Sequence, residues 1–264
     1  MAKNVVLSFD DGRLDTYTNA YKILKKYGMT CTVNVVTDFV ENEENYSCFK
    51  SANNKSMSKE QVLELEKNGV EIACHGHTHQ NTPKDVLENI EHLNIMGIDT
   101  SVIGFASPRS QITEDNTFGV GDLVENKVLS YIRSGIQVRR EGFAYAFFSY
   151  VERYTHSKCL FYLLNKRNVL KDESKRVILP SVAITKYTRV KQISYMLDKM
   201  KDGDTVILMF HSVLGKDENG YGVDNWCFDL EKFEQLCKRL ANADICVCTT
   251  RDLVVNKNKQ LSLK

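Results

Sequence analysis

The chain has 264 residues, is 42% hydrophobic and 26% charged, and carries 35 Lys and Arg against 34 Asp and Glu, which leaves a net charge of +1. Because the positive and negative charges nearly balance, no overall electrostatic field would draw the protein to nucleic acid or to an anionic membrane. No stretch is long and apolar enough to cross a bilayer, and no apolar leader precedes the first expected strand. If Met1 is the native start, we expect a cytoplasmic protein with no integral membrane segment and no nucleic-acid partner.

The eight cysteines are spread along the chain without paired CxxC spacing. Several of them fall within apolar runs, which is typical of buried free thiols. We therefore expect neither a disulfide framework nor a cysteine metal site. The cysteines are Cys31, Cys48, Cys74, Cys159, Cys227, Cys237, Cys246 and Cys248.

The first apolar run, Val5 to Phe9, consists of β-favouring residues and ends in the acidic pair Asp10 and Asp11. An apolar run without alternation predicts a strand that is buried on both faces, as in parallel sheets. Helical periodicity follows from Leu14 to Tyr27, and residues 30–36 are again strand-like. The chain thus begins with a strand, a helix and a strand.

The same alternation continues along the chain. Helix starts are indicated by a capping-box pattern at Ser58 and Gln61, and by Thr82 with a proline after it. Strands that alternate with helices, without an internal linker, predict one α/β domain over residues 1–264. The further strands are expected at 70–74, 102–106, 128–133, 177–184, 205–210 and 245–249, and the further helices at 58–69, 82–97, 120–127, 190–200, 228–240 and 251–255.

Two segments interrupt this alternation. Residues 41–55 are rich in Asn, Glu and Ser and predict a long surface loop. Residues 139–176 form an aromatic and basic insertion, which we expect to be a helical excursion whose aromatic side chains pack on the rest of the domain. A lid that contacts substrate is the alternative. The aromatic residues of the insertion are Phe143, Tyr145, Phe147, Phe148, Tyr150, Tyr154, Phe161 and Tyr162.

Residues with metal-binding or proton-transfer chemistry follow three of the expected strands. Asp10 and Asp11 end the first strand, His75 and His79 follow the third, and His211 follows the strongly apolar strand near the end of the chain. The carboxyl ends of parallel strands form the crevice in which α/β proteins bind ligands. We therefore expect these side chains to meet in one site.

A metal site is the first expectation for this group. His75 and His79 are four residues apart, and the glycine after His75 lets the chain turn sharply, so both imidazoles can face one ion. Two imidazoles and one carboxylate leave positions open for water, as a catalytic zinc-like site requires. Because successive side chains point to different sides, either Asp10 or Asp11 can be the ligand while the other acts as a general base. His211 can be the acid that protonates a leaving group.

These stretches resemble the motifs of the carbohydrate esterase family 4, or NodB-like, polysaccharide deacetylases. The family's TFDDG motif corresponds to Ser8–Gly12, its His-Gly-x-[Ser/Thr]-His motif to His75–His79, and its late apolar strand that ends in histidine to Ile207–His211. Order and spacing agree over most of the chain, with residues 139–176 outside the resemblance. The resemblance implies a distorted (β/α)7 barrel that uses a divalent metal to remove an acetyl group from an N-acetylated, sometimes O-acetylated, sugar.

By the same resemblance, Asp10 is the expected general base and His211 the expected general acid. Asp11 becomes the metal ligand beside His75 and His79. This ligand set suits zinc, and also cobalt, nickel, iron or manganese. The metal would polarise the amide carbonyl and activate a water molecule, and no organic cofactor is needed.

The third and fourth motifs of the family are altered. Ala106 stands where the third motif has an arginine, and we expect Arg133, at the end of the next strand, to lie within hydrogen-bond reach of Asp10 and to orient it. The alternative is a surface position for Arg133, with Arg109 or no residue orienting Asp10. The backbone N–H of Arg109 is expected to help hold the oxyanion, because the third motif supplies such a donor in the family. The fourth motif, an aspartate near a tryptophan, has no match, since the only tryptophan is Trp226.

The leading hypothesis is a metal-dependent hydrolase that deacetylates a carbohydrate. One alternative keeps the chemistry and changes the substrate, as in a deformylase or amidase that acts on a lipid- or nucleotide-linked sugar precursor. The other is a catalytically silent carbohydrate-binding relative. The presence of a base, metal ligands and an acid in one sequence favours an enzyme.

Overall fold

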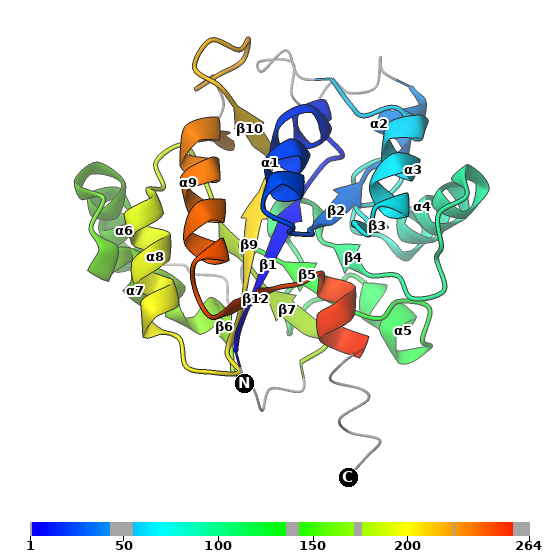
Figure 1. The fold of residues 1–264 in the computed structure, drawn as a ribbon. Helices are drawn as coiled ribbons and strands as arrows, with labels where there is room; N and C mark the ends of the chain where they lie inside the picture. The colour runs from blue at the N-terminus through cyan, green and yellow to red at the C-terminus, as the bar shows by residue number, and fades with distance from the viewer. Residues whose placement is uncertain (1, 43–54, 136–142, 172–175, 224, 256–264) are drawn as a thin grey trace.

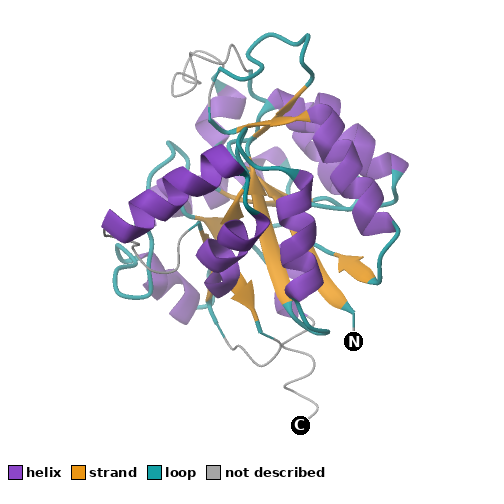
Figure 2. Ribbon diagram, turned by 90° about the vertical axis from the view of Figure 1, so that its left-hand side faces the viewer, coloured by secondary structure: helices purple, strands orange, loops and turns teal. Residues whose placement is uncertain are grey.

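The computed structural model describes residues 2–42, 55–135, 143–171, 176–223 and 225–255. In this part of the chain, parallel strands form a ring with helices outside it (Figures 1 and 2). The strands of the ring, in chain order, are β1 (Lys3–Phe9), β2 (Thr32–Val35), β3 (Glu71–Cys74), β4 (Phe105–Ala106), β5 (Ile132–Ser134), β7 (Ile178–Pro180), β8 (Val182–Ala183) and β9 (Thr205–Phe210).

The ring closes because β7 and β8 are two parts of one strand, interrupted at Ser181. β7 pairs with β5 on one side, and β8 pairs with β9 on the other. β9 pairs with β1 over six residue pairs, and the order β1, β2, β3, β4, β5 completes the circle. With β7 and β8 taken together, the described residues form a seven-stranded parallel barrel.

The barrel is distorted at its amino-terminal end, where two extra strands enter. β12 (Ile245–Val247) pairs with the start of β1, so β2 pairs only with Ser8 and Phe9 at its end. β6 (Val169–Leu170) pairs antiparallel with the start of β9, whereas β8 pairs with its later residues. The predicted distorted (β/α)7 barrel is therefore confirmed. A separate parallel pair, β10 (Ser212–Leu214) and β11 (Cys227–Asp229), lies beyond β9.

The predicted helix starts are present. Ser58 and Gln61 form both bonds of a capping box, and the Thr82 side chain accepts from the backbone N–H of Asp85. A helical stretch at 250–255 ends the described chain. The other helices are η1 (Thr16–Ala20), α1 (Tyr21–Lys26), α2 (Thr37–Glu41), α3 (Lys59–Lys67), α4 (Pro83–Met96), η4 (Pro108–Ser110), α5 (Val120–Glu125), α6 (Phe143–Thr155), α7 (Lys158–Asn165), η5 (Lys166–Asn168), α8 (Val190–Lys199) and α9 (Leu230–Ala241).

The two largest apolar clusters of the described core lie on opposite sides of the strands, because side chains alternate along each strand. Val5, Leu7 and Phe9 belong to the large apolar cluster between the barrel and the helices. Val6 belongs to a smaller cluster that includes Tyr131, Leu179 and Ile207. All four of these β1 side chains are fully buried, so β1 is covered on both faces, as predicted. Burial of one such side chain contributes about 1.5–3 kcal/mol.

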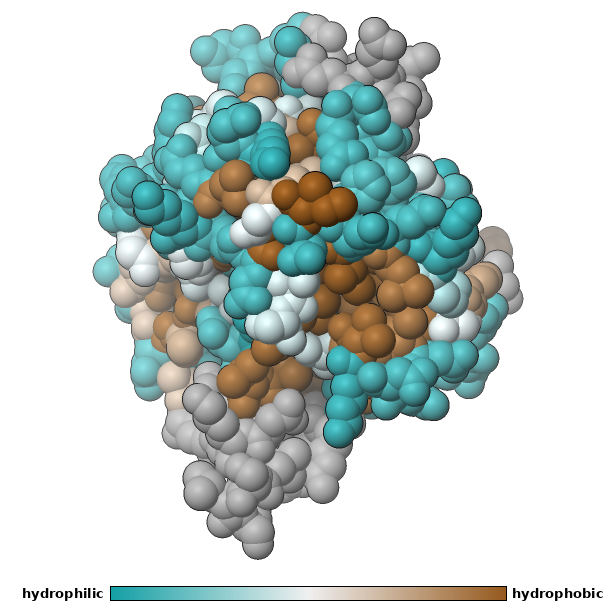
Figure 3. All heavy atoms as spheres, turned by 90° about the vertical axis from the view of Figure 1, so that its right-hand side faces the viewer, coloured by the Kyte–Doolittle hydropathy of each residue, from teal (hydrophilic) through white to brown (hydrophobic). Residues whose placement is uncertain are grey.

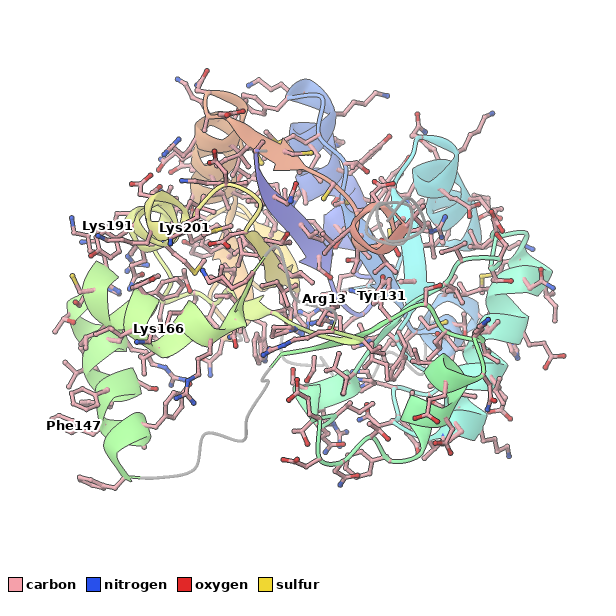
Figure 4. All side chains as sticks on the ribbon, turned by 90° about the horizontal axis from the view of Figure 1, so that it is seen from below. Arg13, Tyr131, Phe147, Lys166, Lys191 and Lys201 are labelled. Carbon is pink, nitrogen blue, oxygen red and sulfur yellow. The ribbon has the colours of Figure 1, made fainter. Side chains whose placement is uncertain are left out.

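The insertion is helical, as predicted, but its aromatic side chains do not pack as expected. Phe143 is 87% exposed and Tyr154 is 71% exposed, and Figure 4 shows Phe147 on the outer side of α6, away from the barrel. Phe161 on α7 is buried. The helical periodicity of the insertion could not show that the described residues leave much of the aromatic side of α6 exposed. Residues 139–142 and 172–175 lie outside the described part.

Three smaller expectations are also decided. Glu41 ends a helix instead of opening a loop, and most of the loop expected at 41–55 lies outside the described residues. The described cysteines are free, but Cys159 and Cys246 are exposed, which contradicts the expected burial. Within the described chain, no helix has the length and apolarity needed to cross a membrane.

The face that carries α3 to α5 is mainly hydrophilic around an apolar area (Figure 3).

Candidate active site

The two aspartates lie at the carboxyl end of β1 and face different ways. Asp10 continues the alternation of Val6 and Ser8, while Asp11 has φ of 74° and turns the chain sharply out of the strand. Aspartate tolerates this left-handed conformation better than most residues. Both carboxylates are buried, with Asp10 3% and Asp11 0% exposed.

The loop between β3 and α4 carries the two histidines of the motif. Gly76 has φ of 81°, and a Cβ atom there would come within 2.3 Å of an Asp85 carboxylate oxygen, so only glycine fits. The Asp85 carboxylate accepts hydrogen bonds from the backbone N–H groups of Thr78 and Gln80. These bonds fold the loop back over the barrel and bring His79 next to His75, with ring centroids 4.9 Å apart.

Asp11, His75 and His79 converge on one point. The Nε2 atoms of His75 and His79 lie 3.4 and 3.6 Å from Oδ1 of Asp11, and one ligand atom of each residue lies within 4.8 Å of the others. Ligands at about 2.0–2.1 Å from a tetrahedral ion are separated by about 3.3 Å, so these spacings suit one metal ion. Asp11 Oδ1 is buried and has no hydrogen-bond partner, as expected of an atom that is a metal ligand.

Each of these three groups is held in the form that binds a metal. Nδ1 of His75 lies 2.8 Å from the carbonyl oxygen of Ala106, which can only accept, so Nδ1 carries the proton and the Nε2 lone pair faces the site. Burial, and then His75, lower the pKa of His79 to about 4, which keeps its ring neutral. Burial acts to raise the pKa of Asp11, but Arg13 and His211 outweigh it, and the pKa lies well below its usual range.

Arg13 was not foreseen as part of this site. It is fully buried, and its Nε donates to Oδ2 of Asp11 at 3.0 Å while another guanidinium nitrogen donates to Ser212 Oγ at 2.8 Å. Arg13 therefore engages one oxygen of Asp11 and leaves the other for an ion. The sequence signal was weak, because an arginine after an Asp-Asp-Gly turn is ordinarily exposed.

Asp10 is held by Arg133, as the sequence predicted. One guanidinium nitrogen of Arg133 donates to both Asp10 oxygens, at 2.6 and 2.7 Å, and Arg133 is 1% exposed, so the surface alternative is wrong. Asn34 on β2 donates a further bond of 2.8 Å to Asp10 Oδ1. Burial acts to raise the pKa of Asp10, but Arg133, His75 and His211 together lower it. Asp10 is therefore ionised, and its orientation is fixed.

His211 faces both aspartates across the site. Its Nε2 lies 3.9 Å from Asp10 Oδ2 and 4.0 Å from Asp11 Oδ2. Burial lowers its pKa to about 4, although Asp11 and Asp10 act to raise it, so the ring is neutral near pH 7. Its Nδ1 has no hydrogen-bond partner among the described residues, and thus no described aspartate tunes it there. Instead, the Trp226 ring packs on the imidazole at 4.5 Å, a contact that the sequence did not predict.

These residues surround a pocket of about 450 Å³. An adjoining pocket of about 400 Å³ shares His79 and Arg109 with it. Arg109 lies in the pocket wall with φ of 55°, and its part in binding an oxyanion stays a prediction. The first pocket is lined by Asp10, Asp11, His75, His79, Ser107, Arg109, Ser110, Gly135, Ala183, Met209, His211 and Trp226, so no described residue of the 139–176 insertion takes part.

The described residues thus form a seven-stranded parallel barrel that carries an Asp-His-His group at the carboxyl ends of its strands. Residues 1–96 match the family model described as polysaccharide deacetylase. A stretch of 96 residues is 31% identical to "Putative polysaccharide deacetylase YxkH" of Bacillus subtilis strain 168 and covers 36% of this chain. The match spans only 26% of the length of that relative.

The structural matches to solved proteins with the same fold cover nearly the whole chain. The peptidoglycan deacetylase PdaC of Bacillus subtilis has a TM-score of 0.51 at 13% identity, over 99% of this chain and 96% of that one. The Xyl-CE4 domain of a multidomain xylanase from the hindgut metagenome of Trinervitermes trinervoides has a TM-score of 0.50 at 17% identity, over 98% and 92%. A family 4 acetyl xylan esterase from Clostridium thermocellum, in complex with a cobalt ion, has a TM-score of 0.50 at 14% identity, over 96% and 91%.

The chain therefore resembles the carbohydrate esterase family 4 polysaccharide deacetylases in two respects. The sequence of its first 96 residues matches the family, and the match includes Asp10 as well as Asp11, His75 and His79 of the metal-type site. The fold matches along almost the whole chain. His211 and Arg133, which lie beyond residue 96, are brought to the same site by the barrel.

Proposed function

We propose that the protein is a metal-dependent hydrolase that removes an acetyl group from an N-acetylated sugar. The observation that carries this proposal is the arrangement of the site: an Asp-His-His group, a carboxylate held by a buried arginine on one side of it, and a histidine across from that carboxylate. Water activation, proton removal and proton delivery each have a residue in one pocket.

Asp11, His75 and His79 would hold the ion. Their fit rests on the unpartnered Oδ1 of Asp11 and on the His75 tautomer set by the Ala106 carbonyl. When bound, a zinc or cobalt ion would polarise the acetyl carbonyl and lower the pKa of a bound water molecule. Zinc is the proposed native metal because two imidazoles and a carboxylate suit it. The cobalt ion in the structure of the Clostridium thermocellum esterase supports a divalent transition metal.

Asp10 would remove the proton from the attacking water molecule. Its carboxylate is ionised and buried, and Arg133 fixes its orientation. No reorganisation is therefore needed before the carboxylate accepts the proton. Arg133 also stabilises the negative charge on Asp10 until the proton arrives. In this scheme Arg133 is a positioning residue, because its guanidinium donates to Asp10 and Ser181.

His211 would deliver a proton to the departing amine. A neutral imidazole must first gain a proton, because it would otherwise become an imidazolate on donating one. The nearest source is the proton that Asp10 takes from water, since Asp10 Oδ2 lies 3.9 Å from His211 Nε2. We infer that this proton passes from Asp10 to His211 and then to the nitrogen, which balances the hydrolysis without another acid.

The shape of the site favours a carbohydrate longer than one unit. Trp226 offers an aromatic face beside His211, and aromatic faces are suited to the apolar side of a sugar ring. The adjoining pocket, which shares His79 and Arg109, gives the chain of sugars a path away from the metal-type site. N-acetylglucosamine oligomers are therefore the first substrates to test.

The test is acetate release from N-acetylglucosamine oligomers by zinc-loaded and by metal-stripped protein, with Asp10→Asn as the matched control. We expect release only from the loaded wild type. Equal release from the stripped protein would contradict metal dependence. Release of formate from N-formylated analogues, without acetate from N-acetylated ones, would assign a deformylase. Sugar binding without any hydrolysis would assign a silent carbohydrate-binding protein.

A further inference from the structure

A second group of metal-type ligands lies outside the candidate active site. Glu41 ends α2, His77 lies in the loop between β3 and α4, and His92 is on α4. One ligand atom of each lies within 4.8 Å of the others. α2 and α4 are neighbours on the right-hand side of Figure 1. Neither the family motifs nor the proposed reaction uses these three residues.

The His77 ring is held by a buried network of hydrogen bonds. Its Nδ1 lies 2.9 Å from Thr37 Oγ1, and Thr37 Oγ1 accepts a hydrogen bond of 2.9 Å from the Asn89 side chain. Thr37 and Asn89 are fully buried. A hydroxyl oxygen has two lone pairs, so it can accept from Asn89 and from Nδ1–H of His77 together. In that tautomer the Nε2 lone pair of His77 is free for an ion, which is the usual arrangement of a metal-binding histidine.

His92 and Glu41 complete the group. Nδ1 of His92 lies 2.8 and 2.9 Å from the two Glu41 oxygens, and the His92 ring stacks on the His77 ring at 4.3 Å. A tetrahedral ion holds its ligand atoms about 3.3 Å apart. Such an ion would therefore separate Nδ1 of His92 from the Glu41 oxygens by about half an ångström. The His92 and Glu41 side chains are 34% and 33% exposed. An ion can therefore reach the group, and water can fill the remaining position.

We propose that Glu41, His77 and His92 bind a second divalent transition-metal ion, with zinc as the best match to two imidazoles and a carboxylate. The ion joins α2, α4 and the loop between β3 and α4. Asn89 connects this group to the active site, because its side chain donates to Thr37 and accepts from the backbone N–H of His75 at 3.0 Å. The second ion thus stiffens the loop that carries His75 and His79.

The experiment counts bound zinc and needs no catalytic activity. The full chain is dialysed against buffered Zn²⁺, and metal per protein is measured for wild type, His79→Ala, His92→Ala and the double variant. His156→Ala is the matched control, because His156 is a histidine outside both groups and contacts Arg189 instead. We expect two ions in wild type and His156→Ala, one in each single variant and none in the double variant. Glu41→Gln should weaken binding of the second ion and leave binding of the first ion unchanged.

A second measurement covers the case in which a variant folds poorly. Zn²⁺ should raise the unfolding temperature of His79→Ala, because an ion that binds only the folded state stabilises it, and this rise should vanish when His92→Ala is added. The proposal is wrong if wild type and His92→Ala bind the same amount of zinc, or if His156→Ala loses as much as His92→Ala. Failure of the proposed hydrolysis would leave these counts unchanged, so the two proposals are tested separately.

Discussion

Removal of the Arg133 guanidinium is expected to damage the site in a defined way. In Arg133→Ala the Asp10 carboxylate stays buried and keeps the Asn34 bond, but it loses a partner that contacts both of its oxygens at 2.6 and 2.7 Å. Breaking a buried ion pair from one side typically costs about 3–5 kcal/mol. We expect the free energy of unfolding to fall by about that amount at pH 7, measured by urea unfolding.

The pH dependence separates this loss from simple damage to packing. Arg133 is the first of the groups that lower the pKa of Asp10 against the effect of burial, so without it the pKa rises. In wild type, the stabilisation from ionised Asp10 is present above the unfolded pKa of about 3.9 and is lost as the pH falls through the lower folded pKa. In Arg133→Ala a protonated Asp10 needs no cation, and the difference in stability between the two proteins should therefore shrink as the pH is lowered.

The same variant should lose turnover and keep its metal. We expect kcat to fall by about 10²- to 10⁴-fold, as for loss of a general base, with the acidic limb of the pH profile moved to higher pH. Arg133→Lys, which keeps the charge and loses the guanidinium nitrogen that donates to Ser181, should recover part of the rate. An unchanged acidic limb in Arg133→Ala, or loss of bound metal in that variant, would refute the role assigned to Arg133.

Four further outcomes follow from the site and the core. His79→Ala should lose most of the zinc bound at the active site, measured by metal analysis, and full occupancy would contradict the ligand assignment. Asp11→Asn should lose this zinc, whereas Asp10→Asn should keep it and lose about 10²- to 10⁴-fold in rate, so equal metal loss would mean that both carboxylates bind the ion. Trp226→Ala should raise the pKa of His211 from about 4, because burial is the main cause of the low value. An unchanged pKa in an NMR titration of the metal-free protein would contradict this expectation. Tyr131→Phe removes a 2.7 Å hydrogen bond to buried Glu71 and should lower the free energy of unfolding by about 1–3 kcal/mol, and equal urea midpoints would show that another donor replaces it.

The sequence predicted the α/β alternation and the main site because both depend on local patterns, whereas closure of the sheet into a barrel was implied by the resemblance to the deacetylase family. Apolar runs mark strands, and the residues directly after parallel strands lie at one end of the sheet, which is why Asp10, His75 and His211 could be placed together. Arg133 could be assigned for the same reason, since it lies near the carboxyl end of β5 and its side chain reaches Asp10 at the end of β1.

The remaining features depend on contacts between segments far apart in the sequence. Trp226 reaches His211 only because β10 and β11 pair, and two three-residue strands give no periodic signal. Arg13 is buried because Asp11 and Ser212 both accept from it, which no residue scale can predict. The prediction that the aromatic side chains of α6 are packed was wrong. Helical periodicity shows which residues share a face of a helix but not what covers that face.

The most direct test of the central claim is a crystal structure of the protein with Zn²⁺ and acetate, phased to locate zinc by anomalous scattering. We expect a zinc ion about 2.0–2.2 Å from Asp11 Oδ1 and from Nε2 of His75 and His79. We also expect an acetate oxygen at hydrogen-bond distance from the backbone N–H of Arg109, with Asp10 bonded to Arg133 and away from the metal. A zinc ion bound by Asp10, or no zinc between Asp11 and the two histidines, would contradict the proposed metal site.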